Sequence, residues 1–314
     1  MNIVIFSPAA DFTKEQQEQL ATSGTITYSE SPMEHPAEYF INLAKNADVI
    51  GIDPDNVGGF EGANEKVTAI LEGLPTLKGV ALSTTSFGWI DRKYCRKRNI
   101  NVTNIPGYSR ESVAEHTLAL LLNLAKRILI TDRRTQKGAY KMELGFELKG
   151  KTLGIIGIGN IGSRLAELAQ GIGMQVIAFN RTPTQVPGVT MKSLDDVLRE
   201  SDAIAFHVTH EDANMNMIKA AHIAKMKDGV ILVNTADRGV IDEAALAAAL
   251  RSGKIYGYAY EGSDLVHTPL AGIENAIGLK GFGWYTRESL KNLYQIWVNS
   301  MIALAKGAPI NVVN

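Results

Sequence analysis

Three glycines at the spacing Gly-x-Gly-x-x-Gly are the residues of this sequence best placed to do chemistry: Gly157, Gly159 and Gly162. They follow a short apolar run and open a segment with a helical pattern. In that context the first glycine permits a tight turn, the second lets backbone amides approach a pyrophosphate, and the third lets the helix pack on the strand. The positive end of the helix favours the phosphates. The loop, with Asn160 and Ile161 between its glycines, therefore predicts a dinucleotide site.

The residues after the next expected strand bear on which dinucleotide is bound. In a site for NAD a carboxylate about 20 residues after the glycines holds the ribose hydroxyls. Here that place is occupied by Asn180, Arg181 and Thr182, with no carboxylate. Because Arg181 and Thr182 can donate to a 2′-phosphate, the loop predicts NADP. The alternative, that Arg181 is a solvated loop charge and the pocket accepts NAD or NADP, stays open.

Composition excludes several classes of protein. The 314 residues are 45% hydrophobic and 21% charged, which is typical of a globular chain with room for two domains. A formal charge of −1 provides no basic field for nucleic acid or an anionic membrane. No apolar run is long enough to span a bilayer, and no His, Cys and carboxylate cluster has the spacing of a metal site. The single cysteine, Cys95, favours a reducing compartment, so we expect a cytoplasmic protein.

Strand and helix patterns alternate twice along the chain. Short apolar runs separated by helical segments fill residues 2–83, and a second series fills residues 152–258. This rhythm predicts an α/β fold with two doubly wound parallel sheets. Between the series, one long helix is expected from about Ser109 to Thr135. A second long amphipathic helix is expected over 286–306, closed by Gly307.

Further motifs occur in order along the chain: Asn104–Gly107, Ser112–His116, Gly150–Gly162, Ser201–Val208, Met226–Gly229, Val233–Ala236 and Gly307–Asn314. Taken together, these segments resemble the D-isomer-specific 2-hydroxyacid dehydrogenase family. The resemblance covers nearly the whole chain and implies a flavodoxin-like substrate domain formed by residues 1–102 and 287–314. A Rossmann dinucleotide-binding domain, residues 103–286 with the interface helix, would be inserted in it. The resemblance also implies a small-molecule substrate and a homodimer, and the long helix carries more apolar residues than its own domain needs: Leu118, Leu121, Leu122 and Ile128.

The resemblance also implies which residues form the site. Backbone amides of a loop at Thr85, Ser86 and Phe87 would hold the substrate carboxylate. The cofactor would be bound, besides the glycine loop and residues 180–182, by residues that follow the later strands: His207, Val208, Thr209, Thr235, Ala236, Asp237, Glu261, Gly281 and Gly283.

The catalytic residues of that family are absent from their places. The family uses an arginine that binds the substrate, a histidine that gives the proton and a glutamate that tunes the histidine. Counting along the motifs, these places hold Asp237, Gly281 and Val266. His116 is interpreted as a helix-packing residue.

Four residues are candidate replacements for the missing groups. Arg238 could swing into the cleft, or it could be a loop charge paired with Asp237. Lys280 and Tyr285, or Tyr260, could donate a proton if a neighbour lowered their pKa. The alternative, which we favour, is that each belongs to the scaffold or the surface. The aromatic residues near 256–260 and 282–285 would form either a pocket for a flat ligand or ordinary packing.

Two hypotheses from different classes follow. The first is a reductase that prefers NADPH and has an altered active site, so that simple 2-oxo acids are poor substrates for it. The alternative is a catalytically inactive NADP-binding sensor or partner-binding protein. A third possibility is a bound cofactor that assists a reaction other than a redox reaction.

Overall fold

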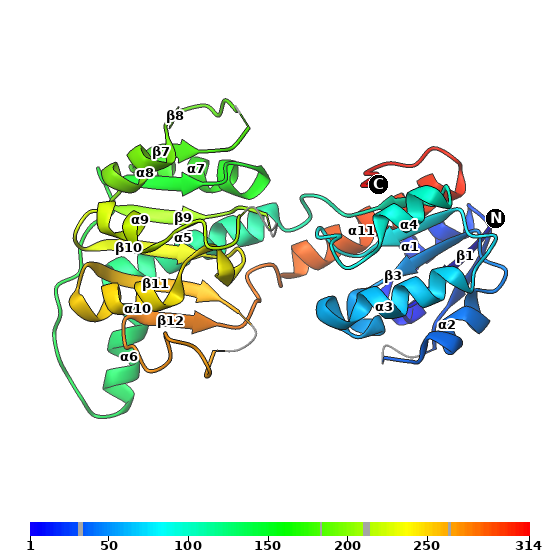
Figure 1. Cartoon of the computed structure of the whole chain (residues 1–314), viewed down its shortest axis with the longest axis horizontal. Coiled ribbons are helices and arrows are strands. Elements are labelled where there is room, and N and C mark those ends of the chain that lie inside the picture. The colour runs from blue at the N-terminus through cyan, green and yellow to red at the C-terminus, as the bar shows by residue number, and fades with distance from the viewer. Residues whose placement is uncertain (31–33, 183, 210–213, 263–264) are drawn as a thin grey trace. The chain divides into compact units, whose positions relative to one another are not determined.

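The chain divides into two compact units. The computed structural model describes residues 1–30, 34–182, 184–209, 214–262 and 265–314. Unit 1 comprises Met1–Tyr108 and Arg287–Asn314, and unit 2 comprises Ser109–Thr286 (Figure 1). The first boundary follows Tyr108, not residue 102, because the segment after the fifth strand stays bonded to unit 1. There the Asn104 amide donates to the Asn311 carbonyl at 3.2 Å.

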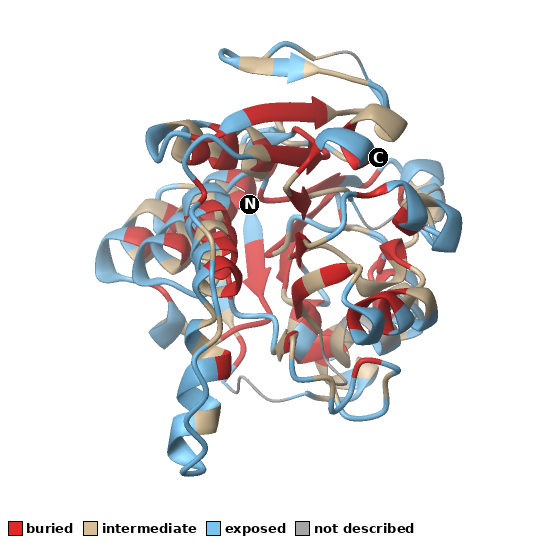
Figure 2. Cartoon of the chain, turned by 90° about the vertical axis from the view of Figure 1, so that its left-hand side faces the viewer, coloured by how far each residue is buried: buried red, intermediate tan, exposed pale blue. Residues whose placement is uncertain are grey.

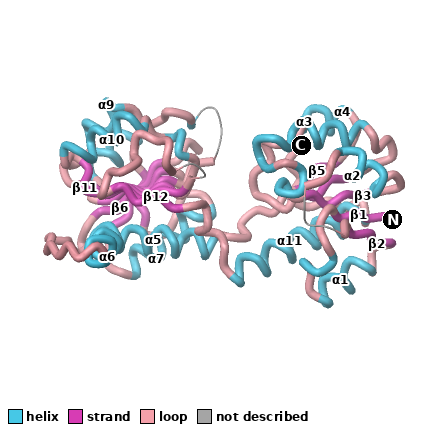
Figure 3. The backbone as a smooth tube through the Cα atoms, turned by 90° about the horizontal axis from the view of Figure 1, so that it is seen from below, coloured by secondary structure: helices cyan, strands magenta, loops and turns pink. Residues whose placement is uncertain are grey.

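Unit 1 is built on five parallel strands in the order β2-β1-β3-β4-β5. This is the flavodoxin-like order. Helices cover both faces, α2, α3 and α4 on one and α1 and α11 on the other (Figure 3). The strands are β1 (Asn2–Ile5), β2 (Thr25–Tyr28), β3 (Val49–Ile52), β4 (Gly79–Leu82) and β5 (Asn101–Thr103). The helices are η1 (Ala9–Asp11), α1 (Lys14–Ala21), α2 (Ala37–Ala44), η2 (Pro54–Val57), α3 (Gly59–Glu72), α4 (Arg92–Lys97) and α11 (Arg287–Ala305).

Unit 2 is built on seven parallel strands in the order β12-β11-β10-β9-β6-β7-β8. The order reverses between β6 and β9, which makes this a Rossmann-type sheet with its switch point beside the glycine loop. The strands are β6 (Thr152–Ile156), β7 (Gln175–Phe179), β8 (Val189–Met191), β9 (Ala203–Phe206), β10 (Val230–Asn234), β11 (Ile255–Glu261) and β12 (Ala276–Leu279). The helices are α5 (Arg110–Lys126), α6 (Ile128–Gln136), α7 (Asn160–Gly171), α8 (Leu194–Glu200), α9 (Ala220–Lys225), η4 (Arg238–Val240) and α10 (Glu243–Ser252).

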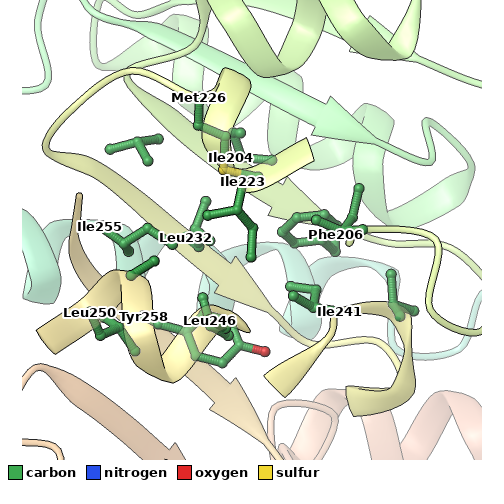
Figure 4. Close-up of a cluster of buried hydrophobic side chains, with 14 of the residues drawn as sticks. Ile204, Phe206, Ile223, Met226, Leu232, Ile241, Leu246, Leu250, Ile255 and Tyr258 are labelled. Carbon is green, nitrogen blue, oxygen red and sulfur yellow. The ribbon is translucent and has the colours of Figure 1, made fainter. Parts of the chain in front are cut away.

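Both faces of the larger sheet are buried. The central strands are buried along most of their length, whereas the covering helices expose one side (Figure 2). On one face Ile204, Phe206 and Leu232 pack against Ile223 of α9 and Leu246 of α10 (Figure 4). On the other face α5 and α7 cover the same strands. The sheet is thus a rigid base from which the strand ends hold the site.

The expected long interface helix is in fact two helices, so that prediction was wrong. α5 ends at Lys126, and Arg127 adopts a left-handed conformation with φ of +58° before α6 begins. Tertiary contacts fix this break: the Arg127 guanidinium lies 4.1 Å from the centre of the Tyr256 ring and pairs with Glu143 at 3.1 Å. The Asn123 side chain accepts the Leu129 amide and satisfies the start of α6.

The α/β fold with two parallel sheets is confirmed, and the elements that were not predicted are short. They are α4, β5, β8, β12 and the short helices η1, η2 and η4. Three of these are edge strands of three or four residues. Such strands show too few residues for a period-2 pattern to stand out.

Candidate functional site

The glycine loop has the backbone geometry expected of a dinucleotide cradle. Gly157 has φ of +95°, and a Cβ there would lie 2.7 Å from the carbonyl carbon of His207. A Cβ on Gly162 would collide with the carbonyl oxygen of Gly157. At Gly159, by contrast, a Cβ would meet nothing within 4 Å, and no side chain caps α7 there. The helix end therefore faces open space with its first amides available to an anion, so these residues fit the diphosphate of NAD(P).

Asn180 joins the glycine loop to the loop after β7. Its side-chain oxygen accepts the Ile158 amide at 3.2 Å, and its side-chain nitrogen donates to the Thr182 carbonyl at 2.8 Å. Arg181 and Thr182 are exposed. A neutral amide therefore stands at the position of the carboxylate, next to an exposed guanidinium.

His207 follows β9 and contacts the residues that follow β10. Its Nδ1 lies 3.3 Å from the Thr235 hydroxyl, which is 3.4 Å from the Thr117 hydroxyl of α5. Its Nε2 is buried without a hydrogen-bond partner among the described residues. Burial lowers the pKa of His207 to about 4. The imidazole is therefore neutral at pH 7. Gly157 of the glycine loop approaches the backbone of this same residue.

The end of β10 carries Asp237 and Arg238. The Asp237 carboxylate accepts the Gly239 amide at 2.6 Å and so starts η4. Arg238 has a partner that sequence reasoning did not consider. Its Nε and Nη2 donate to the two carboxylate oxygens of Glu243 at 2.7 and 2.8 Å, and its guanidinium lies 5.4 Å from the centre of the Tyr260 ring. This pair raises the pKa of Arg238 further, so the residue is a fixed cation already matched to an anion.

The end of β11 carries Glu261, which is bonded to α5 and to the loop after β12. Its Oε1 accepts the amides of Phe282 and Gly283 at 2.9 and 2.8 Å. The Nε2 of His116 lies 3.4 Å from the same oxygen. Burial opposes ionisation of Glu261, yet His116 and the two amides outweigh it and hold the pKa of this carboxyl below its ordinary value.

The remaining candidates for catalysis lie on the loop after β12. Lys280, Gly281 and Tyr285 are exposed, and a Cβ at Gly281 would meet nothing within 4 Å. The Tyr285 side chain stands edge-on to Trp284, with ring centres 5.2 Å apart. The catalytic roles of Lys280 and Tyr285 stay predictions.

The predicted substrate loop Thr85, Ser86 and Phe87 follows β4 in unit 1. The Asn104 side chain donates to the Thr85 carbonyl at 2.7 Å, and the Trp89 indole donates to the Ser86 carbonyl at 3.0 Å. These bonds fix the loop at the carboxyl edge of its own sheet. Its role as a carboxylate site stays a prediction.

The described part of the chain lacks two kinds of feature. No helix there is long and apolar enough to cross a membrane. No group of three or more His, Cys, Asp or Glu side chains in those residues is arranged to hold a metal ion.

Sequence reasoning missed the contacts that depend on distant segments. His116 was assigned to helix packing, but it stands beside Glu261. The sequence held only one signal, a histidine in the part of α5 whose neighbouring residues are buried. Nothing local connects that turn to the end of β11.

The chain is similar to known oxidoreductases. A model of the D-isomer specific 2-hydroxyacid dehydrogenase NAD binding domain matches residues 118–277. Glyoxylate reductase of Thermococcus litoralis is 35% identical over 262 residues, which cover 78% of this chain and 79% of that protein. Hydroxypyruvate reductase of Blautia hydrogenotrophica is 33% identical over 263 residues, which cover 78% of this chain and 81% of that protein.

Solved structures agree in fold along the full length. An acyclic imino acid reductase in complex with NADPH and D-Arg superposes with a TM-score of 0.86 at 25% identity, covering 100% of both chains. D-lactate dehydrogenase from Aquifex aeolicus, complexed with NAD and lactic acid, superposes with a TM-score of 0.78 at 31% identity, covering 98% of this chain and 96% of that one.

Proposed function

The chain belongs to the D-isomer-specific 2-hydroxyacid dehydrogenase family, and from this premise we propose that it is a reductase that prefers NADPH and does not act on simple 2-oxo acids. The observation that carries the proposal is Asp237, at the place where the family has a substrate-binding arginine. The substrate is instead a compound with a carbon–nitrogen or carbon–oxygen double bond that is neutral or cationic near Asp237.

The cofactor is held by groups of unit 2. The amides at the start of α7 bind the diphosphate, and Arg181 and Thr182 bind the 2′-phosphate. When bound, NADPH supplies a hydride to the substrate carbon. Gly159 supports this assignment, because the space at its Cβ position is open.

The charges at the end of β10 disfavour a carboxylate substrate. Asp237 is an anion where a guanidinium would attract the substrate. The neighbouring cation, Arg238, is held by both oxygens of Glu243 at 2.7 and 2.8 Å. Moving it to the substrate would leave Glu243 without this partner, and a hydrogen bond between charged groups contributes about 1.5 to 3 kcal/mol. Arg238 is therefore a costly substitute.

The comparisons bear on this proposal from two sides. The imino acid reductase with NADPH and D-Arg supports reduction of a carbon–nitrogen double bond on this fold. The glyoxylate and hydroxypyruvate reductases, at higher identity, favour 2-oxo acids. Substrate-dependent oxidation of NADPH distinguishes the two.

The experiment offers the full chain the 2-oxo acids glyoxylate, hydroxypyruvate and pyruvate, and separately acetaldehyde, which has no carboxylate, with and without methylamine, which forms the imine in solution. We expect faster oxidation of NADPH with acetaldehyde or its imine than with any of the 2-oxo acids. Turnover of the oxo acids alone at about tens per second, an ordinary enzyme rate, would refute the substrate class. In Asp237→Asn the like charge is removed, so turnover of glyoxylate should rise, and Asp195→Asn on the exposed helix α8 is the matched control.

The absence of all three catalytic residue types favours a second candidate, a cofactor-binding protein without turnover. It predicts that NADPH raises the melting temperature while no imine, oxo acid or aldehyde causes oxidation. Any oxidation that depends on substrate, and that Gly159→Ala abolishes, would exclude it.

A further inference from the structure

The proposed reductase needs a proton donor, and the place of the family's imidazole holds Gly281. A carboxylate to orient that imidazole is missing as well, since Val266 stands in its place. Yet an imidazole and a carboxylate do meet in unit 2, at the carboxyl edge of its sheet. They are His116, in the second turn of α5, and Glu261, the last residue of β11.

This pair is attached to the same loop that lost the histidine. Glu261 accepts the amides of Phe282 and Gly283, the two residues directly after Gly281. The first turn of α5 is tied to the loop too, because the Ser112 hydroxyl donates to the Gly283 carbonyl. The imidazole beside this loop is therefore supplied by α5, whereas the family's imidazole belongs to the loop.

The loop leaves room for the ring of His116. A Cβ on Gly283 would lie 2.8 Å from its Cδ2, so a glycine is needed for the imidazole to stand there. The Phe282 ring is edge-on to it, with ring centres 5.1 Å apart. Glu261 and His116 expose 11% and 15% of their side chains, so the pair is largely shielded from water. Shielding strengthens the attraction between a carboxylate and an imidazolium.

The geometry of the pair suits a donor awaiting its substrate. The separation of 3.4 Å between Nε2 and Oε1 is long for a hydrogen bond, as is common in catalytic pairs before the substrate binds. His207, the imidazole that follows β9, is a poor alternative because burial lowers its pKa to about 4.

We propose that His116, oriented by Glu261, donates the proton in this reductase. The inference rests on the proposed function. The hydride of NADPH goes to the carbon of the double bond, and the π electron pair goes to its nitrogen or oxygen. That atom takes the Nδ1 proton of the His116 imidazolium, whose Nε2 faces Glu261. His116 becomes neutral imidazole and regains a proton from water. NADPH becomes NADP⁺, so one hydride and one proton are consumed for each double bond reduced.

The test compares three variants of the full chain with the wild type, using the acetaldehyde and methylamine mixture or whichever probe the wild type reduces. His116→Gln removes the donor, His116→Ala leaves space for added imidazole, and Glu261→Gln keeps an acceptor for the two amides but removes the charge. His222→Gln, in α9, is the control. Binding of NADPH is measured separately by its fluorescence, and melting temperature reports folding.

We expect His116→Gln to lower kcat by about 10²- to 10⁴-fold, the usual contribution of a general acid. KM and the dissociation constant of NADPH should stay close to the wild-type values. Added imidazole should restore part of the activity of His116→Ala, which a purely structural role of His116 would not allow. Glu261→Gln should also lower kcat, and His222→Gln should leave kcat unchanged.

Other outcomes overturn the inference in distinguishable ways. A wild type that turns over while His116→Gln keeps its kcat refutes the donor and leaves the proposed function intact. A weaker affinity of Glu261→Gln for NADPH at unchanged kcat would make Glu261 a cofactor ligand and refute its orienting role. If His116→Gln does not fold, unchanged kcat in a folded Glu261→Gln still refutes the pair. No turnover of any probe by the wild type refutes the proposed function and the inference with it.

Discussion

At the scale of single residues, the proposed preference for NADPH over NADH rests on Asn180 and Arg181. The Asn180 amide bonds to both the Ile158 amide and the Thr182 carbonyl. A carboxylate at this position would still accept the Ile158 amide, but it would repel a 2′-phosphate bound by Arg181. Under this proposal, the choice of cofactor depends on the one amide group of Asn180.

We expect Asn180→Asp to weaken the binding of NADPH about tenfold or more, since a charge-assisted contact of about 1.5 to 3 kcal/mol is opposed. Binding of NADH should not weaken. The dissociation constants are measured by nucleotide fluorescence for the two cofactors. Thr184→Val, which removes a hydroxyl near Asn180 without adding charge, is the control. Equal losses for NADPH and NADH would show that the loop is merely distorted.

His207 links stability to pH. Because burial lowers its pKa from 6.5 to about 4, the unfolded chain binds more protons between these two values than the folded chain. The free energy of unfolding contributed by His207 therefore falls as the pH drops from 6.5 to about 4, by on the order of 1 to 3 kcal/mol.

In His207→Gln this source of acid sensitivity is absent. Urea unfolding at pH 7.5, 6, 5 and 4.5 should give a smaller loss of stability for the variant than for the wild type, whereas parallel curves would contradict the assigned burial effect. These pH values are about the span over which the imidazole charges.

At the scale of elements, the turn from β6 into α7 contains one glycine that the fold requires and another that nucleotide binding requires. A Cβ at position 157 meets the backbone of His207, and the φ of +95° strains any other residue there. A Cβ at position 159 meets open space. The two glycines are therefore needed for different reasons.

We predict that Gly157→Ala lowers the melting temperature and also abolishes binding of NADPH. Gly159→Ala should change the free energy of unfolding by only about 1 kcal/mol or less, a normal effect at a helix N-cap, and still weaken nucleotide binding strongly. Thermal melts with and without NADPH measure both effects. A Gly159→Ala protein that binds NADPH like the wild type would disprove the cradle.

At the scale of the whole molecule, unit 2 exposes apolar side chains that its own core does not use. Leu121, which was expected to contribute to an interface, is fully buried in its own unit. Leu122 and Ile128 are 37% and 55% exposed, and the segment after α6 exposes Tyr140, Met142 and Leu144 by 78%, 82% and 93%. Such a surface favours a homodimer through α5, α6 and this segment.

We expect the wild type to scatter light as a dimer at micromolar concentration and the double variant Met142→Asp, Leu144→Asp to be a monomer with an unchanged fold. Both side chains are almost free of contacts within the chain, so charge at these positions should affect only association. Ile310→Asp, in unit 1, is the control for an exposed apolar residue. A wild-type monomer would rule out the dimer.

The sequence by itself determined the features that depend on local backbone requirements. A glycine is needed at 157 whatever surrounds the loop, and alternating apolar runs and helices produce parallel sheets covered on both faces. The absence of arginine, histidine and glutamate from positions 237, 281 and 266 is likewise a property of the sequence alone.

Only the tertiary structure decided how side chains from distant segments pair. Arg127 breaks the interface helix because Tyr256 and Glu143 hold its guanidinium. Arg238 is occupied by Glu243, and His116 stands beside Glu261 because α5 crosses the end of β11. A chain contains many oppositely charged residues that could pair with a given charged side chain. Which pair forms depends on the distances between the charges, and packing sets these distances in a way that no local sequence pattern encodes.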